Sequence, residues 1–170
     1  MVVIIILILL AAASRLLPHP PNFAPVAAIG LFAGAVMNRR IAWIVPFAAL
    51  LLSDLVLGFY HPVAMFWNYL AFAGCLALGA LMLSQQRTFG RLVGATLASS
   101  IVFFAVSNFG MWASGYYPRT LAGFTTCYTM ALPFFRNTLV SDALFCALLF
   151  GAHAAFGALA ARSRTRTAHA

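Results

Sequence analysis

The sequence predicts an all-α membrane protein with six transmembrane helices. The chain has 170 residues, of which 64% are hydrophobic and only 7% are charged, and its mean hydropathy is +0.99. Soluble domains carry about 25% charged residues, so this composition excludes a water-soluble fold. The apolar residues also occur in runs of the length that a membrane helix needs, roughly 20 residues for a hydrocarbon core of about 30 Å.

Arginines, prolines and polar clusters divide the chain into six apolar runs that form one domain. The expected spans are residues 1–17, 23–38, 41–60, 62–84, 92–117 and 139–161. Segment 118–138 contains Pro118, Pro133, two arginines and several threonines, so it is expected to form a partly helical external loop. Residues 162–170 form a basic tail. GxxxG spacings at 30–34 and 90–94 favour close packing between helices.

The first apolar run has two interpretations. Ala11 to Ala13 resemble the small-residue cleavage site of a signal peptide, but the run lacks a basic segment before it. A first membrane helix is therefore the preferred interpretation, and cleavage of residues 1–13 stays open.

The charges predict how the helices are oriented. All basic residues are arginines and the only acids are Asp54 and Asp142, which gives a net charge of +8. The arginines are scattered between apolar runs and form no basic face, which argues against a nucleic-acid partner. With the amino terminus inside, seven arginines fall in cytoplasmic segments and three, Arg15, Arg119 and Arg136, fall outside. We therefore expect both termini in the cytoplasm, with the tail near anionic lipid headgroups.

Polar side chains from four expected helices and two loops gather in the outer half of the bundle. A charged group within a membrane needs a partner, water or a function, so this asymmetry predicts a pocket open to the outside. The expected ligand-binding residues are Asp54, Asn68, Asn108, Trp112, Tyr116, Arg136 and Asp142, and the expected lid residues are Arg15, His19, Asn22 and Arg119. Two acids against three external arginines predict a nearly neutral or slightly positive site. In the alternative interpretation, the acids pair with arginines only to close the bundle.

Cys75 shares a helical face with Asn68 and Phe72, where it would form the floor of the pocket. A thiolate is a soft ligand suited to a cobalt corrinoid, while a buried cysteine is more often a packing residue. The cysteines lack the spacing of a zinc or redox motif, and no GxSxG, Walker or HExxH motif is present. No resident metal, cofactor or catalytic activity is therefore expected.

Five segments carry a resemblance to a known family: RLLPHPPNFAPVAAIGLF (15–32), LLLSDLVLGFY (50–60), SNFGMW (107–112), YPRTLAGF (117–124) and PFFRNTLVSDALF (133–145). In these segments the chain resembles an uncharacterised family of bacterial inner-membrane proteins, and the match spans most of the chain. More distantly, that family is similar to the S components of energy-coupling-factor transporters, six-helix proteins that capture vitamins or metal ions from the outside.

The distant similarity covers size, helix count and orientation. It implies that external loops close over a ligand, and that small residues on the first helix contact a coupling subunit; Ala11 to Ala13 and Ala24 with Ala28 are the candidates. A solitary S-component-like cobalamin transporter of Gram-negative bacteria is a further analogue, which makes cobalamin one candidate ligand.

Three hypotheses for function follow. The leading one is a substrate-capture protein of a bacterial inner membrane, which takes up a small water-soluble nutrient such as a vitamin with the help of a separate energising module. The second is a membrane scaffold or assembly protein whose polar cluster only holds the helices together. The third is a membrane enzyme acting on a lipid or a bound cofactor, with His19, His61 or Cys75 as its reactive groups.

Overall fold

The computed structural model of the chain describes residues 9, 12–16, 18 and 20–167. Its regular elements in that part of the chain are helices: α2 (Val26–Val36), α3 (Arg39–Ala42), α4 (Ile44–Leu57), α5 (Pro62–Met82), α6 (Phe89–Ala113) and α7 (Leu121–Thr167). Residues 12–16, before α2, are also helical. The expected all-α class is therefore confirmed for the described residues. Most of the expected first span lies outside them, and of its alternative cleavage site, Ala11 to Ala13, only Ala12 and Ala13 are described.

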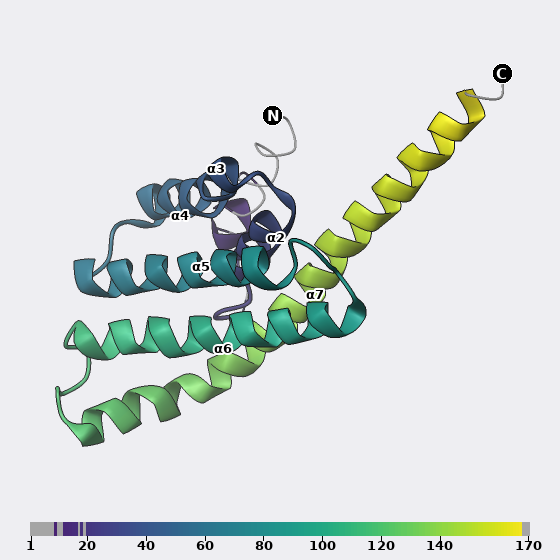
Figure 1. Ribbon diagram of the computed structural model, residues 1–170. Coiled ribbons are helices and arrows are strands. Elements are labelled where there is room, and N and C mark those ends of the chain that lie inside the picture. The colour runs from purple at the N-terminus through teal and green to yellow at the C-terminus, as the bar shows by residue number, and fades with distance from the viewer. Residues whose placement is uncertain (1–8, 10–11, 17, 19, 168–170) are drawn as a thin grey trace.

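The short helix α2 forms the centre of the bundle. Successive helices α4, α5 and α6 run in alternating directions, and α2 lies across them (Figure 1). It contacts α4, α5, α6 and α7, and its residues from Val26 to Ala35 are buried. Eleven residues rise only about 16 Å, roughly half of a hydrocarbon core. The expected span 23–38 is therefore observed as a shorter helix in the core of the bundle, which by itself covers only part of the thickness of a membrane.

Two glycines let α2 and α5 approach closely. A Cβ atom at Gly34 would lie 2.0 Å from the carbonyl oxygen of Leu76, and one at Gly79 would lie 2.0 Å from the carbonyl oxygen of Leu31. No side chain fits at such distances, so each glycine is required by the backbone of the facing helix. The GxxxG spacing at 30–34 thus lies in a helix contact, whereas a Cβ atom at either glycine of the 90–94 pair would meet no atom within 4 Å.

Local signals in the sequence explain where the helices begin and end. Gly58 follows the last residue of α4 with φ of 90°, a conformation that other residues rarely adopt. His61 caps α5 by accepting a hydrogen bond from the backbone N–H of Val63, and Pro62 occupies the first turn. Thr88 caps α6. The expected spans 41–60, 62–84 and 92–117 correspond to α4, α5 and α6, with ends that differ by up to four residues.

The structure corrects the expected external loop over 118–138. From Leu121 onward the chain is helical, and the expected span 139–161 is the middle of the same 47-residue helix, α7. The first part of α7 lies beside α6, where Tyr128 donates a hydrogen bond to the carbonyl of Ala105 at 2.6 Å. The later part crosses α6 and projects from the bundle (Figure 1), and residues 151–159 are exposed.

Threonines and a proline suggested a loop here, but both are accommodated in the helix. Thr125 and Thr126 donate hydrogen bonds to the carbonyls of Leu121 and Ala122, so their hydroxyls are satisfied within the helix. Pro133 lies inside α7 and deprives the carbonyl four residues earlier of its usual helical partner. Thr129 lies at that position.

Arg87 joins three helices at the end of the bundle formed by the α5–α6 loop. Its guanidinium donates to the carbonyl of Ala35 at 2.9 Å and to that of Leu83 at 3.2 Å. A third contact, 3.4 Å long, reaches the ring nitrogen Nε2 of His153 in α7. One side chain therefore fixes α2, α5 and α7 relative to one another.

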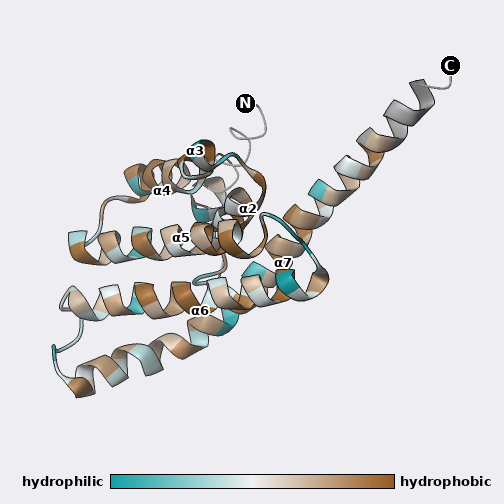
Figure 2. Ribbon diagram, in the orientation of Figure 1, coloured by the Kyte–Doolittle hydropathy of each residue, from teal (hydrophilic) through white to brown (hydrophobic). Residues whose placement is uncertain are grey.

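The apolar surface supports a membrane location. Four helical segments are long and apolar enough to cross a membrane: Arg40–Leu57, Pro62–Met82, Phe89–Ala113 and Leu121–Leu159. Large apolar side chains on their outer faces are exposed, among them Val56 at 70% and Leu81 at 81%. Brown covers most of these helices, and hydrophilic residues gather at the α5–α6 loop (Figure 2). Such a surface is stable against lipid but not in water. The six-helix count stays a prediction.

Candidate functional site

A buried ion pair joins the N-terminal segment to α4. Arg15 Nη1 lies 2.8 Å from Asp54 Oδ1, and Asp54 is 1% exposed. The hydroxyl of Tyr69 on α5 donates to the other carboxylate oxygen, Oδ2, at 2.9 Å. Arg15 also donates to the Ser53 hydroxyl and to the carbonyl of Leu50. Both oxygens of Asp54 are therefore occupied by groups of the protein itself.

The second acid, Asp142 on α7, has a different environment. It is 2% exposed, and the Ser100 hydroxyl of α6 donates to its Oδ2 at 2.7 Å. Thr138 lies one turn before it and is also buried. The only ion pair between described residues is that of Arg15 with Asp54, so no described cation neutralises Asp142.

α7 also holds the segment that precedes α2. The amide of Asn137 donates to the carbonyl of Pro21 at 3.0 Å, and the hydroxyl of Ser141 donates to the carbonyl of Ala24 at 3.2 Å. Between these two contacts lies Asn22, with φ of 60°, a left-handed conformation that asparagine tolerates better than most residues. Its side chain is thereby placed between α7 and α5.

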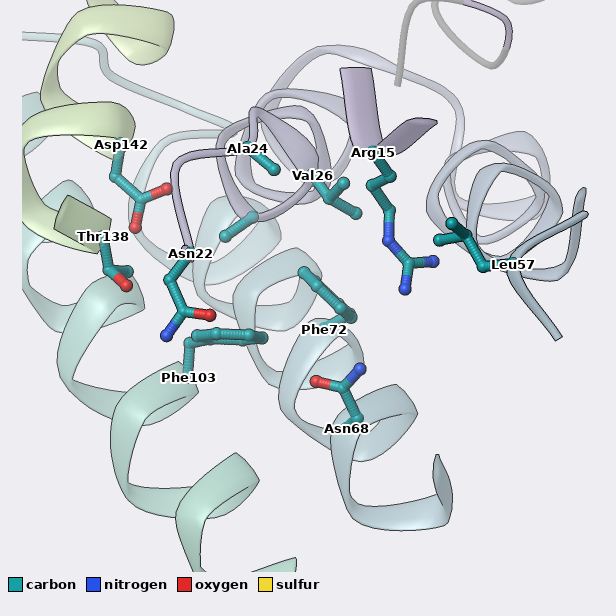
Figure 3. A pocket seen from close by; sticks show the side chains of 11 residues that line it. Arg15, Asn22, Ala24, Val26, Leu57, Asn68, Phe72, Phe103, Thr138 and Asp142 are labelled. Atoms are coloured by element: carbon teal, nitrogen blue, oxygen red, sulfur yellow. The ribbon is translucent and has the colours of Figure 1, made fainter. Parts of the chain in front are cut away.

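Two adjoining cavities occupy the space between these groups. The first, the Asp142 cavity, has a volume of about 280 Å³. Its polar and aromatic lining comprises Arg15, Asn22, Asn68, Phe72, Phe103, Thr138 and Asp142. Asp142 and Thr138 lie on one side, Arg15 and Leu57 on the other, and Phe72, Phe103 and Asn22 between them (Figure 3).

The second, the Tyr60 cavity, has a volume of about 300 Å³ and is lined by Tyr60, Ser107, Asn108 and Met111, among others. It shares Arg15, Asn22, Asn68 and Phe103 with the Asp142 cavity, so the two adjoin. Asn68 donates a hydrogen bond to the Tyr60 hydroxyl at 2.8 Å. Burial raises the pKa of Tyr60 above its usual range, so this hydroxyl stays protonated at neutral pH and retains a hydrogen to donate.

The profile of a family of unknown function, DUF6580, matches residues 1–165. The chain belongs to this family. No curated protein and no solved structure matches it. The expected membership in an uncharacterised family is thus confirmed. Because the DUF6580 description names no activity, the chemistry of the site has to be argued from its own residues.

The structure brings together about half of the residues expected at the site. Arg15, Asn22, Asn68 and Asp142 line the Asp142 cavity, and Asn108 lines the Tyr60 cavity. Asp54 lines neither cavity and instead holds Arg15, which lines both. His19 lies outside the described residues.

Four other expected site residues do not line either cavity. Trp112 donates its indole N–H to the carbonyl of Pro118 at 3.1 Å and packs against Phe124. Tyr116 is 59% exposed, Arg119 donates to a carbonyl at the end of α6, and Arg136 is exposed on α7. The spacing of 108, 112 and 116 predicts one helical face, but α6 ends at Ala113, so Tyr116 lies beyond the helix.

Cys75 lies beside the site and not in it. The residue is fully buried, in a cluster with Phe72, Val26 and Leu50, and its thiol lies 3.7 Å from the carbonyl oxygen of Ser99. Phe72 lines the Asp142 cavity and Cys75 does not. In the described part of the chain, no three His, Cys, Asp or Glu side chains form a group that could hold a metal ion.

Sequence reasoning missed the aromatic lining of the site. Phe72 and Phe103, whose ring centroids lie 4.8 Å apart, belong to α5 and α6. Phe72 is one helical turn after Asn68, a spacing that put it on the same face as the amide. Phe103 is one of many phenylalanines in an apolar run, and nothing in its sequence context separates it from lipid-facing neighbours.

Proposed function

We propose that the chain captures a small water-soluble nutrient, such as a vitamin, within a bacterial inner membrane. The observation that carries the proposal is the pair of adjoining cavities, lined by amides, hydroxyls and a carboxylate, inside a bundle whose outer surface is apolar. Burying an amide or a carboxylate costs free energy unless the group forms hydrogen bonds or pairs with an opposite charge. Small-molecule sites typically combine an apolar wall with a few such polar groups.

The cavity residues suit binding more than catalysis. Two of the three groups that the sequence offered as reactive lie elsewhere: His61 caps α5, and Cys75 is buried in the core, while His19 lies outside the described residues. No nucleophile and base in the described lining form a pair of the kind that covalent catalysis uses. We therefore propose a binding protein and no enzyme, with cobalamin as one candidate ligand and with a separate module as the energy source.

Membrane transport accounts for the apolar exterior as well. In this proposal the chain resembles an S component in general plan, with both termini in the cytoplasm. The Tyr60 cavity lies toward the α4–α5 and α6–α7 connections, which are external in that orientation, so it would be the entrance. The Asp142 cavity would be the deeper part of the same site.

The test is a thermal unfolding assay of the purified protein in detergent, with a panel of vitamins, corrinoids and metal ions. A ligand present at 100 times its Kd adds about 2.7 kcal/mol to the stability of the folded state. We expect one compound to raise the Tm of the wild-type protein, and Asn68→Ala to remove this shift. Arg136→Ala is the matched control, since Arg136 is exposed and lines neither cavity.

The scaffold hypothesis has a supporting observation in the ion pair of Arg15 with Asp54, which already satisfies the buried charges of α4. It predicts that no compound raises the Tm and that Asn68→Ala changes only the stability of the protein. That result across the whole panel would replace the capture proposal.

A further inference from the structure

The charges around the two cavities do not balance. Among the described residues, Arg15 is the only arginine in their lining, and its charge is matched by Asp54 at 2.8 Å. Asp142 adds a second carboxylate to the lining without a described cation beside it. Arg119 and Arg136, which the sequence placed at the site, lie outside the lining. The described site therefore carries one excess negative charge when Asp142 is ionised, in place of the neutral or slightly positive site expected from the arginine count.

Asp142 retains capacity for a further partner. A carboxylate accepts about four hydrogen bonds, and among the side chains that the structure describes, Ser100 alone donates one to Asp142. The residue is only 2% exposed, and its carboxylate faces the cavity (Figure 3). A buried carboxylate in this position is stabilised by a cation more than by any neutral group.

The two phenylalanine rings of the cavity also favour a cation. Phe72 and Phe103 line the cavity together, with ring centroids 4.8 Å apart. The face of an aromatic ring attracts a cation placed within about 6 Å of its centre, and phenylalanine offers no hydrogen bond to an anion. Asn22 and Asn68 line both cavities and supply amide groups, and Tyr60 supplies a hydroxyl in the Tyr60 cavity.

We propose that this site selects a small organic cation, whose ammonium group binds the Asp142 carboxylate against the rings of Phe72 and Phe103. The polar remainder of the molecule would bind the amides of Asn22 and Asn68. This inference rests on the proposed capture function and names the chemical class of its ligand. Each cavity, at about 280 and 300 Å³, matches the lower end of the range of small-molecule pockets, about 300–1,000 Å³.

The experiment compares cations with matched uncharged and anionic probes on the full-length protein in detergent. Choline, thiamine and agmatine are the cations, 3,3-dimethylbutan-1-ol is the uncharged analogue of choline, and pantothenate and biotin are the anions. Binding is measured by isothermal titration calorimetry. We expect at least one cation to bind and the anions and the uncharged analogue to bind at least tenfold more weakly.

Two variants locate the binding. Asp142→Asn keeps the shape of the side chain and removes its charge, and we expect it to raise the Kd of the cation at least tenfold. Phe103→Leu tests the aromatic wall without touching a charge, so it serves if Asp142→Asn does not fold. Its control is Phe135→Leu, since Phe135 packs against Phe104 and lines neither cavity.

The outcomes separate this inference from the proposed function. If pantothenate or biotin binds, and Asn68→Ala abolishes that binding while Asp142→Asn does not, the capture function stands and the cation inference fails. The cation inference also fails if a cation binds with equal affinity to wild type, Asp142→Asn and Phe103→Leu. If no probe of any charge binds, the cation inference fails, and the capture proposal fails with it only if no compound of the thermal unfolding panel raises the Tm.

Discussion

The two aspartates are almost equally buried, yet we expect very different losses of stability when each loses its charge. Asp54 is 1% exposed and Asp142 is 2% exposed. Asp54→Asn leaves the guanidinium of Arg15, whose side chain is only 17% exposed, without its carboxylate. Asp142→Asn removes a charge that no described cation neutralises, and the Ser100 hydroxyl can still donate to the amide oxygen.

The magnitudes follow from these partners. Breaking a buried ion pair by removing one member costs about 3–5 kcal/mol, because the remaining charge is left uncompensated. The partial exposure of Arg15 favours the lower end of that range for Asp54→Asn. At Asp142 the exchange of one hydrogen bond for another should change stability by no more than about 1 kcal/mol. The expected difference between the two variants is therefore at least about 2 kcal/mol.

The assay is unfolding by SDS titration in dodecyl maltoside micelles, followed by far-ultraviolet circular dichroism. Arg15→Gln and the double variant Arg15→Gln/Asp54→Asn complete a double-mutant cycle, which isolates the energy of the pair. We expect the double variant to be more stable than the sum of the single losses predicts. Two results would refute this reasoning: additive losses of stability in the cycle, or a loss of stability in Asp142→Asn as large as that in Asp54→Asn. Either result would mean that Asp54 is not the structural partner of Arg15 while Asp142 is unpaired.

Four shorter predictions concern the packing, the site boundary and the topology. Gly79→Ala should lower stability by about 1–3 kcal/mol, since its Cβ would meet the carbonyl oxygen of Leu31 at 2.0 Å; Gly94→Ala, which meets nothing within 4 Å, should lose none in the same titration. Arg87→Gln should speed amide hydrogen exchange at the adjoining ends of α2 and α7, and unchanged exchange would contradict its role as a tie. Trp112→Leu should leave ligand affinity within about twofold, because the indole lines neither cavity and donates to the carbonyl of Pro118; a tenfold loss would place the indole in the site. A reporter that is active only in the cytoplasm should be active when fused to the C-terminus, and one that is active only outside the cytoplasm should be inactive; the reverse pattern would contradict the predicted orientation.

Composition was sufficient to predict the helical class and the membrane-like surface. Runs of apolar residues separated by Gly58, His61 with Pro62, and Thr88 also located α4, α5 and α6, because a glycine with positive φ and side-chain caps are local signals. Such signals depend on neighbouring residues alone, so they can be read without knowing what the helix packs against.

The first part of α7, which was expected to be a loop, shows where local signals fail. Pro133 and the threonines of 118–138 are typical of loops when considered residue by residue. In the folded chain, threonine hydroxyls donate to carbonyls one turn earlier, and Tyr128 and Phe135 pack on α6. Contacts with another helix, which no local pattern records, determine that this segment is helical.

Part of the cavity lining could be predicted from the sequence, but the pairing of its charges could not. The collection of polar residues on one side indicated that Arg15, Asn22, Asn68 and Asp142 would converge, and the structure brings them to one cavity. Which acid would pair with Arg15 depends on how the first helical segment lies against α4, and that arrangement has no sequence signature. Counting arginines outside the membrane therefore overestimated the positive charge of the site.

This pairing determines what the polar cluster can do. If Arg15 lay beside Asp142, both charges on the cavity wall would be neutralised and a neutral ligand would be favoured. Because Arg15 is held by Asp54, Ser53 and Leu50 on α4, it contributes little free charge to the cavity, and Asp142 on the facing helix keeps its own. Because Arg15 pairs with Asp54, the Asp142 carboxylate is left available for a ligand. Weakening the pair of Arg15 with Asp54 should therefore alter which ligands the cavity beside Asp142 prefers.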